Sequence, residues 1–214
     1  MPGILLHICF AEEVYKRIKP FILLEKCSFL AGNLIPDLAL DKKASHYRKP
    51  ASREGFVVPD LDLARRELFN PNIPVKFGMF CHLYLDYYFI EEFLIPGFIW
   101  DTQNEKVINP RNNKTWDKSV FFSKAGMYGA YAEINNVLLS DGKISYDLLN
   151  MIPEILPSTG IAVYDARREK TWKKELNEYL MESAEYTGNI FDYDRLWHFI
   201  EKTAIQLAEE VAKY

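Results

Sequence analysis

The chain has 214 residues, of which 49% are hydrophobic and 14% aromatic, and its formal net charge is −4. This composition supplies a substantial core, which excludes a disordered protein, and no shift in composition divides the chain, so we predict a single domain over residues 1–214. The lack of a long Lys/Arg run argues against duplex nucleic acid as a partner. No apolar stretch is long enough for a transmembrane segment, and without a basic leader we expect a cytoplasmic protein.

Periodic apolar residues, bounded by proline and capping residues, predict a protein built from helices. The expected helices span residues 4–18, 60–69, 75–94, 116–139, 146–151, 162–183 and 193–213. Residues 31–37 contain Gly32, Asn33 and Pro36 and are predicted to form a turn or loop, residues 41–59 an extended connection, and residues 101–113 a surface loop. No strand pattern is evident, so we predict an all-α domain with six to eight helices.

The stretch FCHLYLDYYF, residues 80–89, places a histidine and an aspartate inside an otherwise apolar segment. In a helix, His82 and Asp86 lie one turn apart on the same face, together with Met79 and Phe89. A buried carboxylate without a partner is costly, so a metal ion or a plain hydrogen bond between His82 and Asp86 must satisfy both groups.

Further histidines and aspartates extend this pair to a candidate metal site. His7 lies on the apolar face of the first predicted helix, His46 follows a serine in the connection, and Asp37 ends the predicted loop. Each alone is an ordinary residue, but the set offers the nitrogen and oxygen donors that zinc accepts. His198 falls beside the apolar stripe of the last helix, and we expect it to be solvated.

Glu133 lies on a helical face with the small residues Gly126 and Gly129, which allow a close approach of a backbone or a ligand. A carboxylate there could bind metal or act as a base. Plain helix packing with Glu133 at the rim is the equal alternative.

Three segments, taken in order after the helix with His7, resemble a known family. They are FLAGNLIPD at 29–37, KKASHYRK at 42–49 and FCHLYLDYYF at 80–89. Together they resemble the zinc-dependent phospholipase C family in its short intracellular bacterial form, over residues 1–95. The resemblance implies an all-α fold related to the phospholipase C and single-strand nuclease fold, with a zinc cluster in a central cleft.

The resemblance also implies a set of metal ligands, which are His7, Asp37, His46, His82 and Asp86, with Asp86 bridging two metals. Secreted members bind a third zinc through later histidines and a glutamate. Here only His198 follows Asp86 among the histidines, and Glu133 is the candidate for that carboxylate. We therefore expect one or two zinc ions or other divalent metals.

These residues predict a phosphoester hydrolase that uses metal-activated water. Asp37 is expected to orient or deprotonate the water, and Arg48 could bind a phosphate oxygen of a small phosphoester or phospholipid headgroup; its alternative is a surface arginine. A nuclease or nucleotide phosphodiesterase of the same fold is one alternative function. A non-catalytic protein, in which metal holds helices together or a phosphorylated ligand binds, is another. Phosphohydrolases with a His-Asp dipeptide are disfavoured, since the chain has none.

Overall fold

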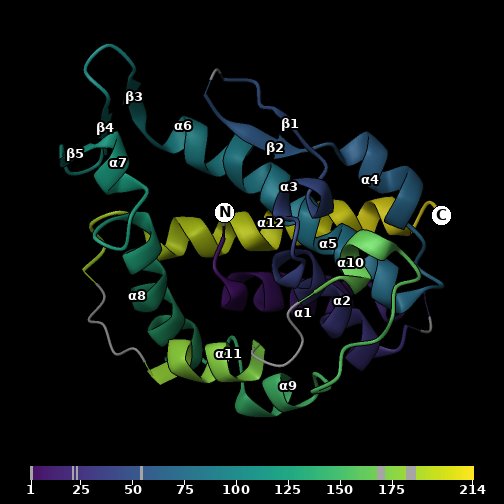
Figure 1. Cartoon of the computed structure of the whole chain (residues 1–214). Helices are drawn as coiled ribbons and strands as arrows, with labels where there is room; N and C mark the ends of the chain where they lie inside the picture. Colours follow the sequence, from purple (N-terminus) through teal and green to yellow (C-terminus); the bar gives the residue numbers. More distant parts are fainter. Residues whose placement is uncertain (1, 21, 23, 54, 168–171, 182–186) are drawn as a thin grey trace.

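The computed structural model describes residues 2–214 except 21, 23, 54, 168–171 and 182–186, and it is mostly helical (Figure 1). The helices are α1 Ile4–Ile18, α2 Lys26–Leu38, α3 Lys42–Ser45, α4 Leu61–Leu68, α5 Pro74–Tyr88, the π-helix η1 Phe89–Leu94, α6 Ile95–Gly97, α7 Lys118–Phe121, α8 Met127–Ser140, α9 Tyr146–Asn150, α10 Ala162–Asp165, α11 Trp172–Met181 and α12 Tyr193–Val211. The strands are β1 Arg48–Pro50, β2 Val57–Pro59, β3 Ile99–Asp101, β4 Lys106–Ile108 and β5 Thr115–Asp117.

Five helices correspond to helices that the sequence predicts. Those expected at residues 4–18, 60–69, 75–94, 146–151 and 193–213 correspond to α1, α4, α5 with η1, α9 and α12. Asp60 caps α4 by accepting hydrogen bonds from the backbone N–H groups of Asp62 and Leu63. These helices bury an apolar face, so their local sequence pattern is enough to predict them.

Two predicted helices are wrong in extent. Residues 116–139 contain strand β5, the short helix α7 and then α8, and residues 162–183 contain α10 and α11, with 168–171 and 182–183 outside the described residues. The structure therefore has more and shorter helices than the six to eight predicted.

The prediction that the chain lacks strands is also wrong. Strands β1 and β2 form an antiparallel hairpin within residues 41–59, and β3, β4 and β5 form a second antiparallel sheet that includes part of the predicted loop 101–113. In the second sheet, the buried residues Trp100, Val107 and Trp116 lie opposite one another. Each strand has three residues, too few for alternation to be recognised in the sequence.

The predicted loop at 31–37 is instead part of α2, which packs closely against α5. A Cβ atom at Gly32 would lie 2.1 Å from the carbonyl oxygen of Val75, and one at Gly78 would lie 2.1 Å from that of Phe29. The glycines therefore allow two helix backbones to meet, and tertiary packing offsets their low helix propensity and the hydrogen bond lost at Pro36.

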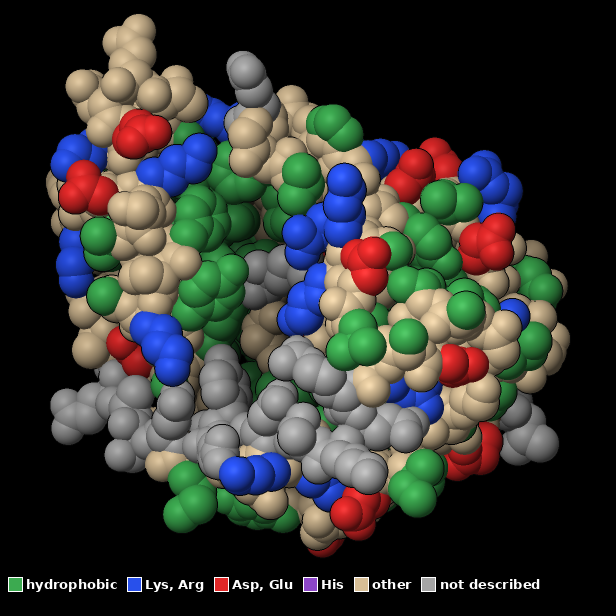
Figure 2. Space-filling model, viewed as in Figure 1, with side chains coloured by type: hydrophobic (Ala, Val, Ile, Leu, Met, Phe, Trp, Pro, Cys, Tyr) green, Lys and Arg blue, Asp and Glu red, His purple; other side chains and the backbone are tan. Residues whose placement is uncertain are grey.

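The core joins elements from both ends of the chain. Helix α1 packs against α2, α5 and α12, and α12 crosses the middle of Figure 1. Among the described residues, none of the helices combines the length and the apolar character needed to span a membrane. Figure 2 shows a hollow in one face of the molecule, with hydrophobic side chains on its left wall and Lys and Arg side chains on its right wall.

The close contact between α2 and α5 predicts a large effect of one methyl group. Gly78→Ala should lower the free energy of unfolding by about 2 kcal/mol or more, because backbone atoms cannot yield as a flexible side chain can. Urea denaturation of the variant checks this. Glu209→Ala, at an exposed position of α12, is the control and should change stability by less than about 0.5 kcal/mol. Equal stability of the two variants would contradict the interpretation.

Candidate metal centre

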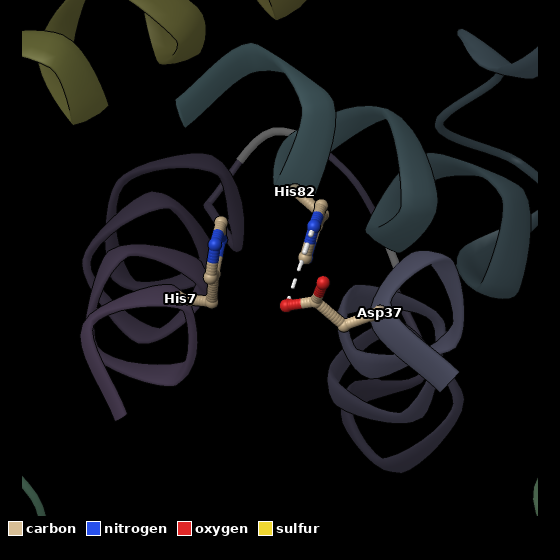
Figure 3. A group of neighbouring side chains, drawn as sticks. All are labelled: His7, Asp37 and His82. Atoms are coloured by element: carbon tan, nitrogen blue, oxygen red, sulfur yellow. Dashed lines mark ion pairs between the residues drawn. The ribbon is translucent and has the colours of Figure 1, made fainter. Parts of the chain in front are cut away.

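Four segments bring three histidines and two aspartates together. His7 comes from α1, Asp37 from α2, His82 and Asp86 from α5, and His46 directly follows α3. Figure 3 shows His7, Asp37 and His82 pointing toward one another from three helices. The side chains of the three histidines and Asp86 are at most 1% exposed, whereas that of Asp37 is 26% exposed. The cluster is therefore buried, with one member that reaches solvent.

Backbone carbonyl groups hold two of the imidazole rings. Nδ1 of His82 lies 2.8 Å from the carbonyl oxygen of Asn33, and Nδ1 of His46 lies 2.9 Å from that of Lys42. A carbonyl oxygen only accepts hydrogen bonds, so both Nδ1 atoms carry hydrogen and donate. In the neutral rings, each Nε2 then has a lone pair directed into the cluster, which is the usual preparation of a metal-binding histidine.

Three donor atoms form a nearly equilateral triangle. Nε2 of His46 and Nε2 of His82 are 3.4 Å apart, and each lies 3.5 Å from Oδ2 of Asp86. Donors about 2.0–2.1 Å from a tetrahedral zinc ion lie about 3.3–3.4 Å from one another. These separations match the edge of such a tetrahedron. The two imidazole nitrogens both present lone pairs, so a cation rather than a hydrogen bond between them fits the geometry.

His7 and Asp37 extend the cluster beyond this triangle. Nε2 of His7 lies 3.3 Å from Oδ1 of Asp86, which is the carboxylate oxygen that is not part of the triangle. His7, Asp37 and His82 also offer donor atoms that lie within 4.8 Å of one another. Since Nδ1 of His82 is bonded to Asn33, its single remaining nitrogen can bind only one ion. A second ion would therefore rely on His7, Asp37 and the second oxygen of Asp86.

Unsatisfied buried atoms favour a cation over a plain hydrogen-bonded pair. Both oxygens of Asp86 and both ring nitrogens of His7 are buried without a hydrogen-bond partner. Leaving a carboxylate in this condition costs several kcal/mol, roughly, whereas coordination of a metal satisfies both oxygens. The residues present thus fit a divalent ion, and the nitrogen and oxygen donors are compatible with zinc.

The electrostatic environment shifts the pKa values of the three histidines in different directions. Burial lowers the pKa of His46 to about 4, and burial together with the neighbouring His82 lowers the pKa of His7. Burial also acts to lower the pKa of His82, but the carboxylates of Asp86 and Asp37 outweigh it and the pKa lies above its ordinary value. Burial acts to raise the pKa of Asp86, yet His82 and His7 hold it well below its usual range.

Several supporting residues were missed by sequence reasoning. The backbone carbonyl group of Asn33 orients the ring of His82. The side-chain amide of Asn33, in the orientation that satisfies both of its groups, donates to the backbone carbonyl oxygen of His7 and accepts from the backbone N–H of His82. Ser45 donates to the carbonyl oxygen of Pro36 and lies 2.9 Å from Nδ1 of His46. Asn33 and Asp37 are four residues apart, which would place both on one face of a helix, but predicting a loop for residues 31–37 hid this relation.

The structure does not bring Glu133 into the cluster. Its carboxylate accepts hydrogen bonds from the backbone N–H and hydroxyl of Thr187, and α8 lies at the left of Figure 1, away from α1, α2 and α5. It lines a cavity of about 300 Å³ with Trp116, Gly126 and Gly129. These contacts resemble the alternative stated for Glu133, which is plain helix packing with this residue at the rim.

Arg48 and His198 also lie outside the cluster. Arg48 is exposed on β1 and lines a surface cavity of about 580 Å³ with Lys43, Tyr47 and Lys49. His198 is exposed on α12, as predicted.

Comparisons with family models, with functionally characterised proteins and with solved structures give no match to this chain. The resemblance to zinc-dependent phospholipase C therefore stays a prediction. The coarser conclusion stands on the geometry alone, since a buried group of His and Asp side chains could hold a metal ion.

The donor geometry predicts that metal binding depends on His82 and Asp86. His82→Ala and Asp86→Ala should both lose bound metal, measured by elemental analysis, and melt at lower temperature than the metal-loaded wild type. In excess chelator, Asp86→Ala should approach the wild type, because it removes an unsatisfied buried carboxylate, whereas His82→Ala leaves that carboxylate with less compensation. His198→Ala is the control, and unchanged metal content in all three variants would refute the assignment.

The pKa shifts predict how stability varies with pH in chelator. His46 stays neutral in the folded chain but takes up a proton in the unfolded chain below pH 6.5, so stability should fall as pH falls from 6.5 toward 4, and the lowered pKa of His7 acts in the same direction. The raised pKa of His82 contributes stability below pH 6.5 that is lost as pH rises above it. The cluster therefore favours maximum stability near pH 6.5.

Urea denaturation of wild type and His46→Gln at pH 4.5, 5.5 and 6.5 checks this dependence. In the wild type, the free energy of unfolding should change with pH more steeply than in the variant, by up to about 1.4 kcal/mol per pH unit, which is the value for one proton. Identical slopes would show that His46 is not held neutral.

Proposed function

We propose that the protein is a metal-dependent hydrolase of phosphoester bonds, with zinc as the favoured ion, similar in chemistry to phospholipase C. The triangle formed by Nε2 of His46, Nε2 of His82 and Oδ2 of Asp86 carries this proposal, because its edges of 3.4 to 3.5 Å suit a tetrahedral ion with a fourth position to fill.

The exposure of Asp37 supports a reactive rather than a purely structural ion. Structural zinc is usually enclosed by four protein ligands, whereas catalytic zinc keeps a position for water. On the side of Asp37, the cluster meets solvent, and the carboxylate oxygens remain 3.7 and 3.9 Å from the nearest nitrogens of His46 and His82. A divalent ion bound there would lower the pKa of a water molecule and polarise a phosphoryl oxygen.

Asp37 is the residue best suited to orient that water and accept its proton. Burial acts to raise the pKa of Asp37, but His82 and Lys42 lower it below its ordinary value, so the carboxylate is ionised at neutral pH. Glu133, the other candidate base, is engaged with Thr187. These contacts support assigning the proton-accepting role to Asp37 alone.

The surroundings of His46 support a substrate with an anionic group. Tyr47 and Arg48, the two residues after His46, line a surface cavity that Asp41 and Asp60 also line. Arg48 has no ion-pair partner among the described residues, and its guanidinium is therefore free to bind a phosphate oxygen. An exposed guanidinium two residues after His46 suits a small phosphodiester or a phospholipid headgroup.

A non-catalytic metal site is the second candidate, because four of the five side chains are almost completely buried. In that case, the ion would hold α1, α2, α5 and the segment after α3 together. Nucleotide or nucleic-acid hydrolysis belongs to the first candidate, since the same chemistry cleaves phosphodiesters of either kind.

Hydrolysis of chromogenic phosphodiesters distinguishes the candidates. Chelator-treated protein reloaded with zinc should release p-nitrophenol from p-nitrophenylphosphorylcholine or from thymidine p-nitrophenyl phosphate, and chelator should abolish the release. Asp37→Asn should reduce kcat by about a hundredfold or more, because it removes the proton acceptor. Metal content measured alongside separates this effect from loss of the ion.

His198→Ala is the matched control and should retain full activity. If the wild type at full metal occupancy hydrolyses none of a broad panel of phosphoesters, the structural candidate replaces the hydrolase.

A further inference from the structure

Lys42 lies at the solvent-facing side of the cluster. Its Nζ atom is 3.3 Å from Oδ1 of Asp37, and these side chains are 46% and 26% exposed. The other four members of the cluster are at most 1% exposed. Of the described residues that contact the cluster by an ion pair, Lys42 thus supplies the one cation at the side through which a ligand could enter.

The backbone of Lys42 is fixed to the same site. Its carbonyl oxygen accepts the hydrogen bond from Nδ1 of His46, and the preceding Asp41 caps α3 by accepting from the N–H groups of Lys43 and Ala44. Movement of this backbone would displace a candidate ligand. The flexible side chain of Lys42 can move, whereas the point from which it extends cannot.

Lys42 and the candidate ion compete for one carboxylate. Oδ1 of Asp37 faces both Nζ of Lys42 and, at 3.7 Å, Nε2 of His46. A divalent ion beside His46 would therefore have an ammonium group as a like-charge neighbour, which weakens its binding. The repulsion also favours displacement of the ammonium group toward solvent.

The charge balance shows what that ammonium group would bind. With neutral imidazoles, the carboxylates of Asp37 and Asp86 balance one divalent ion, and Lys42 then adds one uncompensated positive charge at the exposed side. An anion with several oxygen atoms can contact the ion with one oxygen and the ammonium group with another. A charge-assisted hydrogen bond of this kind is among the stronger ones.

We propose that Lys42 is a specificity-determining residue that selects a tetrahedral oxyanion, such as inorganic phosphate or the phosphoryl group of a phosphodiester, by contacting it while the metal ion binds it. The inference rests on the proposed function, since it requires a metal ion in the cluster. It adds a residue that lowers metal affinity and raises anion affinity at the same time.

Lys19 provides a control at another place in the molecule. It is exposed directly after α1, and it does not line the surface cavity that contains Arg48. No ion pair is found for Lys19 within the described part of the chain. Lys19→Met removes the same charge as Lys42→Met but from a position that does not contact Asp37.

Two binding measurements test the proposal. Zinc affinity is measured by competition with a chelating dye, and phosphate affinity by calorimetry with zinc-loaded protein freed of excess metal. Lys42→Met should bind zinc about threefold more tightly, since a partly exposed cation no longer competes. It should bind inorganic phosphate about tenfold more weakly, the loss of one charge-assisted hydrogen bond.

Lys19→Met should leave both affinities within about twofold of the wild type because solvent screens its charge. Lys42→Arg, which keeps the charge, should retain most of the phosphate affinity. If Lys42→Met and Lys19→Met behave alike while the wild type binds zinc and phosphate, Lys42 has no special role and the inference fails alone. If the wild type binds no metal, the proposed function fails as well.

Discussion

The carboxylate of Asp86 is the constraint on which the centre of this structure depends. It is completely buried on α5 and surrounded by His7, His46 and His82, yet neither of its oxygens has a hydrogen-bond partner. Such a charge is tolerated only where positive charge compensates it. Backbone carbonyl groups hold His46 and His82 with Nε2 facing this carboxylate, and Nε2 of His7 lies 3.3 Å from its Oδ1, which is an arrangement that a divalent ion could complete.

The close packing of α2 and α5 makes this arrangement possible. Gly32 and Gly78 remove the side chains that would separate the two backbones, and Asn33 can then reach His82 with its carbonyl oxygen. The same residue binds the backbone of α1 through its amide. The candidate metal ligands therefore depend on the helix packing, and a change in packing would alter the distances between their donor atoms.

The solvent-facing side of the cluster distinguishes a structural role of a bound ion from a catalytic one. His7, His46, His82 and Asp86 form the buried part of the cluster, and Asp37 with Lys42 forms its boundary with water. A carboxylate and an ammonium group at this boundary can handle a proton and an anion, which are the two requirements of phosphoester hydrolysis besides the ion itself. The short helix α3 places Lys42 and His46 together.

The sequence by itself determined much of the helical content and the composition of the site. Amphipathic spacing located α1, α5 and α12, and the i, i+4 relation of His82 and Asp86 followed from helical periodicity. These are local properties, since hydrophobic burial repeats with the geometry of the helix. His7, Asp37 and His46 could be identified in the sequence as candidate ligands. That they lie close together in space was a hypothesis based on residue chemistry and resemblance.

Only the tertiary structure decided where those residues lie and which atoms face the site. The segment at 31–37 looks like a loop because Gly32, Asn33 and Pro36 are poor helix formers, and it becomes helical because α5 packs against it. Glu133 is separated from the cluster for a similar reason, since the contacts of α8 with other segments fix its direction. Long-range packing sets these distances, and no local pattern in the chain encodes them.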